Sequence, residues 1–224
     1  MNTPRRPRSA PGADLTLPRL LVLTDRSQLR LGRGLLPTLA ECAEAGLTHV
    51  VLRELDEPAE QRARLAELIA ALGLNVIAAR TPLPAAVGVH LPASASCNTS
   101  FDGLLAPSER PDSPCNSVLH LGRSCHSSAE VARAAEEGFD YAMLSPYALT
   151  ESKPGYGPPL GPGAFRELPL PTYALGGITP DNAAEAVDAG AHGVSVMGAV
   201  MRAEEPGQVV RDLLAALAIP KVAP

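Results

Sequence analysis

The stretch "YALGGITPDNAAEAVDAGAHGVSVMGAV", residues 173–200, contains two short apolar runs separated by about one helix length. The first run ends at two adjacent glycines, Gly176 and Gly177. The segment between the runs has a proline near its start, Pro180, and a glycine at its end, Gly190, which is typical of a helix. The stretch therefore predicts a strand, a helix and a second strand, the unit from which parallel sheets are built.

The same alternation runs through most of the chain. Besides the strands predicted at 172–177 and 193–198, six apolar runs predict strands at 20–25, 49–54, 75–79, 88–93, 117–126 and 141–146. Helices are predicted at 34–46, 58–73, 127–138, 179–190 and 206–218. Eight strands alternating with helices predict an α/β protein with a single (β/α)8 TIM barrel. An open, doubly wound sheet is the alternative.

The remaining segments are predicted to be irregular. Residues 1–17 are basic and proline-rich and are predicted to form a flexible N-terminal tail, with the barrel domain spanning 18–220. Residues 94–117 are rich in Ser, Pro, Asn and Cys and are predicted to form a loop.

Composition excludes several classes of function. The 224 residues are 46% hydrophobic, but no apolar stretch approaches the 18 residues of a membrane span, and the N-terminus lacks the apolar core of a secretory signal. A net charge of −5 with 3 Phe, 4 Tyr and no Trp disfavours nucleic-acid binding. The four cysteines show no C-x-x-C spacing, which indicates no zinc site or disulfide framework and fits the reducing cytoplasm.

In a barrel of this kind, functional side chains follow the strands. Polar groups, glycines and one methionine stand at the end of every predicted strand or in the loop after it: Thr24, Asp25, Arg53, Glu54, Arg80, His90, Ser124, Cys125, His126, the segment Thr150–Lys153, Gly176, Gly177, Met197 and Gly198.

The glycines after the seventh and eighth strands are candidates for phosphate binding. Backbone N–H groups of Gly176, Gly177, Met197 and Gly198 could surround a phosphate without any lysine. The alternative is that the glycines only serve tight turns.

His126 is the candidate general acid and base, since histidine, with an ordinary pKa of about 6.5, exchanges protons near neutrality. A purely structural histidine is the alternative, and Cys125 is disfavoured as a nucleophile because no second histidine or asparagine is predicted beside it. Arg53 is expected to meet either an anionic substrate or an internal partner such as Glu54. Lys153 either closes over a ligand or is solvated. The residues alone thus indicate a barrel enzyme that acts on a small phosphorylated ligand by acid–base chemistry.

Four segments together carry a family resemblance: residues 174–200, "GRSCHSSAEVARAAEEGFDYAMLSP" (122–146), "TESK" (150–153) and "VGVHLP" (87–92). With them, the chain resembles the thiamine phosphate synthase/TenI superfamily over residues 18–216. The resemblance implies a barrel that acts on a thiazole phosphate in thiamine biosynthesis.

Two activities compete within that superfamily. The synthase branch carries Gln-x-Arg-x-Lys after strand two, where this chain keeps only Arg53. It also carries an Asn-Asp pair and an Asp for substrate and Mg²⁺, where this chain has Ala78, Ala79 and Ala95. Alanine offers Mg²⁺ no oxygen ligand. The thiazole tautomerase branch, TenI, keeps an arginine after strand two, an arginine after strand three and Gly-Arg-Ser-x-His after strand five, which match Arg53, Arg80 and residues 122–126.

The resemblance therefore favours a thiazole tautomerase, an isomerase that converts the tautomer of carboxythiazole phosphate into the aromatic isomer without a metal or cofactor. It implies that His126 is catalytic and that the phosphate binds Gly176, Gly177, Met197 and Gly198. Residues that would bind the rest of the substrate are Arg53, Arg80, Ser124, Thr150, Ser152 and Lys153. Thiamine phosphate synthase and a non-catalytic regulatory role are the alternatives. The expected partner is a small phosphorylated thiazole, with no nucleic acid and no membrane, and a homodimer is compatible with the apolar helix faces.

Overall fold

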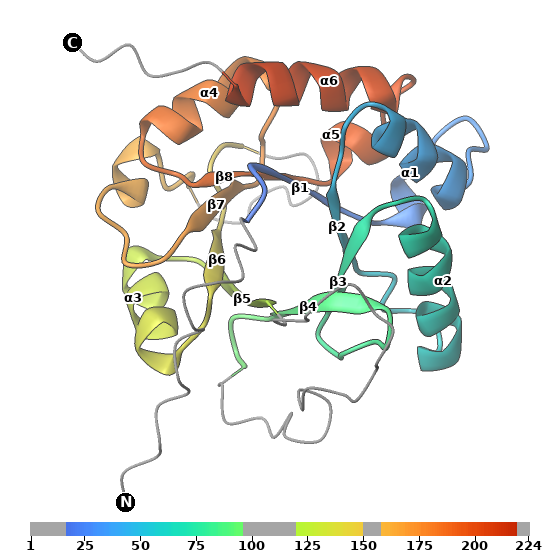
Figure 1. The fold of residues 1–224 in the computed structure, drawn as a ribbon. Coiled ribbons are helices and arrows are strands. Elements are labelled where there is room, and N and C mark those ends of the chain that lie inside the picture. The colour runs from blue at the N-terminus through green and yellow to red at the C-terminus, as the bar shows by residue number, and fades with distance from the viewer. Residues whose placement is uncertain (1–16, 96–119, 150–157, 219–224) are drawn as a thin grey trace, which may run out of the picture.

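The computed structural model describes residues 17–95, 120–149 and 158–218. Its eight parallel strands form a closed barrel in which each strand pairs with the next and β1 pairs with β8 (Figure 1). The strands are β1 (Leu20–Leu23), β2 (His49–Leu52), β3 (Asn75–Ala79), β4 (Ala86–Leu91), β5 (His120–Cys125), β6 (Tyr141–Leu144), β7 (Thr172–Leu175) and β8 (Gly193–Val196). The predicted barrel is confirmed, and the open sheet is wrong.

Helices surround the ring of strands (Figure 1). The predicted ones are α1 (Leu35–Glu44), α2 (Ala59–Ala71), α3 (Ser128–Glu137), α4 (Pro180–Asp188) and α6 (Pro206–Leu217). Three short helices were not predicted: η1 (Arg26–Gln28), η2 (Pro162–Phe165) and α5 (Gly198–Met201). A helix of three or four residues is too short to show a 3.6-residue period. β3 and β4 are joined by residues 80–85, which form no helix.

Most predicted strands extend beyond the observed pairing. The runs at 20–25, 49–54 and 141–146 end in the barrel at Leu23, Leu52 and Leu144. The extra residues are polar groups or prolines that leave the sheet, so the apolar run marks the strand but not where pairing stops. These residues reach the carboxyl edge of the barrel, where the predicted functional groups meet.

Two apolar layers stabilise the fold. The outer layer lies between the strands and the helices, and the inner layer fills the barrel. The inner layer consists of Leu21, Leu23, Val51, Ile77, Ala79, Tyr141, Met143 and Tyr173. Gly122 makes room for one of these side chains, since a Cβ at Gly122 would lie 2.0 Å from Cζ of Tyr141.

The amino end of the barrel is closed by the residues that precede β1. Tyr173 donates its hydroxyl hydrogen bond to the Pro18 carbonyl at 2.6 Å. Nε2 of His192 lies 3.1 Å from the Leu17 carbonyl, and Leu17 packs against the inner layer. The predicted tail, residues 1–17, therefore has its last residue in contact with the barrel, and residues 1–16 lie outside the described residues.

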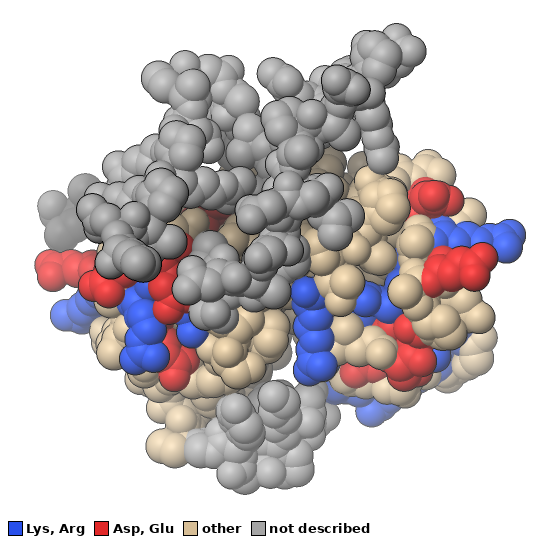
Figure 2. Space-filling model, turned by 90° about the horizontal axis from the view of Figure 1, so that it is seen from below, with Lys and Arg blue, Asp and Glu red and all other residues tan. Residues whose placement is uncertain are grey.

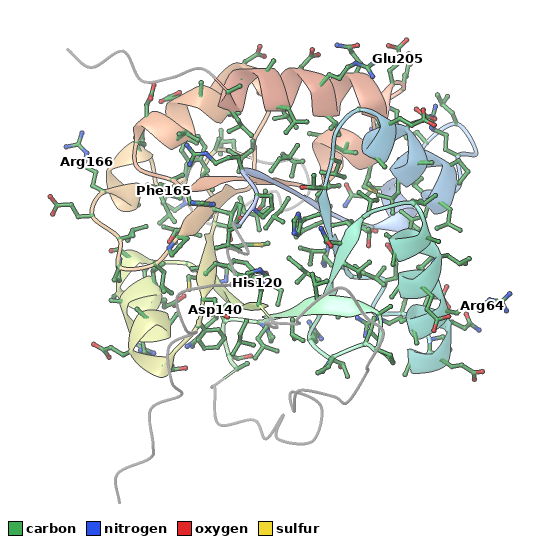
Figure 3. The ribbon with its side chains drawn as sticks, in the orientation of Figure 1. Arg64, His120, Asp140, Phe165, Arg166 and Glu205 are labelled. Carbon is green, nitrogen blue, oxygen red and sulfur yellow. The ribbon has the colours of Figure 1, made fainter. Side chains whose placement is uncertain are left out.

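Acidic and basic side chains are interspersed over the described part of the face in Figure 2. Figure 3 shows Arg64, Arg166 and Glu205 pointing outward, away from the barrel. Across the described ranges, no helix has the length and apolar character needed to cross a bilayer.

Candidate active site

A pocket of about 720 Å³ opens at the carboxyl ends of the strands. This volume lies within the usual range for small-molecule sites. All eight strand ends contribute residues to it, as the sequence predicted. Arg53, Arg80, His90, Ser124 and His126 all line this pocket, although they come from four different strand ends.

His126 is held at both its backbone and its ring. Its backbone N–H donates to Oε2 of Glu130 at 2.7 Å, and Nδ1 lies 3.2 Å from the Ser145 carbonyl. A carbonyl only accepts, so Nδ1 carries the proton in this contact, and the lone pair of the neutral ring is then on Nε2. This tautomer can act as a base through Nε2.

Local sequence explains this placement. Ser127 caps α3 by accepting from the Glu130 N–H at 3.2 Å, while the Glu130 carboxylate accepts a hydrogen bond from the His126 N–H. The arrangement resembles a capping box, except that the glutamate accepts from the N–H of the residue before the N-cap instead of from the N-cap itself. The first turn of α3 thus fixes the residue directly after β5.

Cys125 is not a nucleophile candidate in the structure. Its side chain is fully buried, and burial raises the pKa of the thiol to about 11. A thiol of this kind is protonated and shielded near neutrality, in line with the weak sequence case for it.

The sequence left open whether Arg53 pairs with an internal partner such as Glu54 or faces an anionic substrate. Glu54 pairs with Arg26 at 3.1 Å rather than with Arg53. The Arg53 backbone is fixed by the buried Thr24, whose Oγ1 accepts its N–H at 3.0 Å, and its Nη1 contacts Sδ of Met197 at 2.8 Å. Within the described ranges no carboxylate forms a salt bridge with Arg53, which leaves a cation on the pocket wall.

Arg80 reaches the same pocket from the end of β3. Its φ is +66°, in the left-handed region that a residue with a side chain seldom adopts. The backbone is held there by the hydrogen bond from the Arg80 N–H to the His90 carbonyl at 2.8 Å. Unfavourable backbone geometry at a pocket residue is a frequent feature of functional sites.

Gly176 and Gly177 both line the pocket and both have positive φ, +95° and +67°. A Cβ at Gly177 would lie 2.4 Å from the Leu149 carbonyl oxygen. The close approach that requires glycine here therefore comes from the chain's own loop after β6, so the turn alternative is part of the explanation.

Met197 and Gly198 lie across the pocket, at the start of α5. The first N–H groups of a helix have no intrahelical acceptor, so they are available for other acceptors. Both glycine-containing segments thus border one pocket, as predicted, although the binding of a phosphate there stays a prediction.

The sequence did not indicate Arg202 and Gln28, which also line this end of the pocket. Arg202 donates to the Gln28 side chain, and Gln28 donates to Asp25 at 2.7 Å. The guanidinium lies against Gly198, because a Cβ there would overlap Nη1 of Arg202. The spacing of four residues between Gly198 and Arg202 was the available signal, since helical residues four apart share a face.

Three predicted substrate-binding residues, Thr150, Ser152 and Lys153, lie outside the described residues. Their roles stay predictions.

The described residues do not fit a Mg²⁺ site. Asp25 is the only carboxylate among the described residues that line the pocket, and it accepts hydrogen bonds from Ser27 and Gln28. Ala79 lines the pocket and offers no oxygen from its side chain, while Ala78 and Ala95 pack in the outer apolar layer. In the described ranges, no three His, Cys, Asp or Glu side chains are grouped to hold a metal ion.

Comparison with known proteins places the chain in a family. The profile of the TMP-TENI family, described as thiamine monophosphate synthase, matches residues 20–200. A putative thiamine-phosphate synthase of Geobacter sulfurreducens is 34% identical over 207 residues, which is 88% of this chain and 93% of the relative. A putative thiamine-phosphate synthase 2 of Aquifex aeolicus is 32% identical, over 81% of this chain and 96% of the relative.

A solved structure shares the fold. The thiamine phosphate pyrophosphorylase from Pyrococcus furiosus superposes with a TM-score of 0.72 at 22% identity, over 89% of this chain and 95% of that one. The similarity of sequence over most of both chains, together with the matching family profile, shows that this chain belongs to the TMP-TENI family.

Proposed function

We propose that this protein is a thiazole tautomerase, which converts the non-aromatic tautomer of carboxythiazole phosphate into the aromatic isomer. The observation that carries the proposal is the make-up of the pocket wall. In its described part it combines His126 with Arg53, Arg80 and Arg202, and has a single carboxylate, Asp25, that is already hydrogen-bonded. Such a wall suits an anionic substrate and proton transfer.

The chemistry requires one proton to move. The C2–H bond of the non-aromatic ring breaks, its proton passes to Nε2 of His126, and the electron pair enters the ring system. A C–H bond then forms at the exocyclic carbon with a proton from the same imidazolium, so the base returns to its starting state. Aromaticity of the product drives the reaction, and the Nδ1 contact with the Ser145 carbonyl stabilises the charged ring.

The remaining groups bind and orient the substrate. Arg53 or Arg80 would pair with the carboxylate, since guanidinium groups bind carboxylates through parallel hydrogen bonds. The phosphate would accept hydrogen bonds from the backbone at Gly177 and Gly198, with Arg202 supplying positive charge beside Gly198.

Thiamine phosphate synthase is the second candidate. The names of the relatives favour it over the tautomerase, because three relatives that match over most of their length are named thiamine-phosphate synthases, two of them as putative ones. The unsuitable donor set for Mg²⁺ in the described pocket is the argument against it.

Two assays on one preparation separate the candidates. In the first, freshly generated tautomer is incubated with protein in EDTA, and the aromatic isomer is followed by NMR against a protein-free control. In the second, the protein receives Mg²⁺, pyrimidine pyrophosphate and thiazole phosphate, and thiamine phosphate is measured. Acceleration in the first assay alone supports the tautomerase, and product in the second alone supports the synthase. No turnover in either would indicate the non-catalytic role.

A further inference from the structure

Inside the barrel, His90 lies between two hydroxyl groups. Its Nδ1 is 3.2 Å from the Tyr141 hydroxyl, and its Nε2 is 2.9 Å from Oγ of Ser124. Tyr141 is fully buried, and His90 is 7% exposed. Ser124 is partly exposed and lines the pocket, so the three side chains connect the inner layer to the ligand site.

The hydroxyl of Tyr141 determines the direction of these hydrogen bonds. Among the described residues, Nδ1 of His90 is its one hydrogen-bond partner. If Nδ1 carried the proton, the tyrosine proton would be buried with no acceptor, at a cost of about 1–3 kcal/mol. The favoured arrangement has Tyr141 donating to an unprotonated Nδ1.

His90 itself is neutral near pH 7. Burial, together with the nearby charge of Arg53, lowers the pKa of His90 to about 3. A neutral imidazole has one N–H, so with Nδ1 as acceptor the proton is on Nε2. Nε2 then donates to Oγ of Ser124.

We propose that Tyr141 and His90 are positioning residues that orient the Ser124 hydroxyl proton into the pocket, where it is donated to the ligand. Because Oγ accepts from His90, its own proton points elsewhere, and within the described ranges Oγ has no second partner. The ligand atom opposite Ser124 must therefore be a hydrogen-bond acceptor, which in the proposed substrate, with its phosphate at Gly177 and Gly198, is a carboxylate oxygen or an aromatic ring nitrogen.

Tyr141 can occupy its place only because of Gly122. A Cβ at position 122 would overlap the Tyr141 ring. The ring is also stacked on His90, with centroids 5.6 Å apart and an interplanar angle of 27°. The same contacts that fill the barrel thus hold the imidazole in one orientation.

The first test needs no ligand. Long-range ¹H–¹⁵N NMR of histidine-labelled protein reports the tautomer of each ring, and the spectrum of His90→Gln assigns the His90 signals. We expect a pyrrole-type Nε2 and a pyridine-type Nδ1 for His90. A protonated Nδ1, or a mixture of tautomers, would overturn the proposal, because Ser124 would then donate to His90.

The second test measures binding of carboxythiazole phosphate by calorimetry. Ser124→Ala should weaken binding about 10- to 100-fold, as expected for a lost hydrogen bond to a charged or desolvated acceptor. Tyr141→Phe should weaken it several-fold in the wild-type background and not at all in the Ser124→Ala background, since its effect passes through Ser124. An equal loss in both backgrounds contradicts the proposal.

Tyr173→Phe is the matched control. Tyr173 belongs to the same inner layer, but its hydroxyl donates to the Pro18 carbonyl at the other end of the barrel. Like Tyr141→Phe, this substitution removes one buried hydrogen bond, but it should leave binding unchanged.

The choice between carboxylate and ring nitrogen rests on the proposed function. Binding of two compounds, together with the tautomer of His90, tests the positioning role separately from that function. A loss on Ser124→Ala that disappears with decarboxylated thiazole phosphate assigns the carboxylate, and a loss with both compounds assigns the ring nitrogen. If neither compound binds the wild-type protein, the proposed function fails, whereas the tautomer of His90 still decides the positioning role.

Discussion

His126 is fixed by Glu130 at its backbone and by the Ser145 carbonyl at Nδ1, and in the proposed mechanism Nε2 is the nitrogen that exchanges the proton. His126→Gln keeps a polar side chain of similar reach but cannot exchange a proton near neutrality. We expect kcat to fall by a factor of about 10²–10⁴, with the Kd for carboxythiazole phosphate changed little. Turnover by this variant at the wild-type rate would remove His126 from the mechanism.

Substitution of Gly177 tests the role of the glycine pair. Gly177→Ala combines a strained φ of +67° with a Cβ that would lie 2.4 Å from the Leu149 carbonyl oxygen. Gly138→Ala is the matched control, because its φ is +88° but no atom lies within 4 Å of the added Cβ. We expect the control to lose about 1–2 kcal/mol of stability, and Gly177→Ala to lose more and to bind phosphorylated ligand less tightly.

Calorimetric melting and ligand titration of both glycine variants provide these values. Equal destabilisation of the two would show that the Leu149 contact relaxes freely, and unchanged affinity in Gly177→Ala would remove the phosphate from this turn.

At the scale of single elements, the first turn of α3 couples helix capping to the placement of His126. Glu130→Ala removes the carboxylate that accepts the His126 N–H, and it also removes a negative charge from the positive end of the helix dipole. We expect a loss of about 1 kcal/mol in unfolding free energy and a several-fold fall in kcat with a smaller change in KM.

Glu136→Ala on the same helix is the control, since Glu136 is exposed and lies away from the first turn. Urea unfolding and steady-state kinetics compare the two variants. If both lower kcat to the same extent, the effect is one of helix stability and not of His126 placement.

The elements were also what the sequence predicted best. β3 was predicted with its observed bounds, because its apolar run ends where pairing ends. Arg53, Arg80 and His126 were found because each directly follows a strand. The chain Tyr141–His90–Ser124 was not found, since its members are separated by 51 and 34 positions and only barrel closure brings them together. Arg202 was missed because it lies four residues beyond Gly198 and not directly after a strand.

At the scale of the whole molecule, the histidines make stability depend on pH. Burial lowers the pKa of His49 to about 4 and that of His90 to about 3, and it lowers those of His120 and His192. For His120, the neighbouring Asp140, shown beside it in Figure 3, opposes this shift. Below pH ~6.5 the unfolded chain binds protons that the folded protein does not, so stability is lost as pH falls.

The lowered pKa of His90 determines how much stability this residue loses as pH falls. Its shift corresponds to a loss of about 2 kcal/mol between pH 7 and pH 5, and the partly exposed His49 adds less. Urea unfolding at the two pH values should show a lower midpoint at pH 5 with an unchanged slope. Stability that is constant or higher at pH 5 would contradict the neutral, buried state of these rings.

We propose that this member of the TMP-TENI family isomerises a thiazole phosphate. The most direct measurement is the ratio of two kcat/KM values on one preparation, for tautomer isomerisation in EDTA and for thiamine phosphate formation with Mg²⁺. We predict that the isomerisation value is the larger one and that added Mg²⁺ leaves it unchanged. A larger value for thiamine phosphate formation, with isomerisation no faster than the protein-free control, would contradict the proposed isomerisation and establish the synthase.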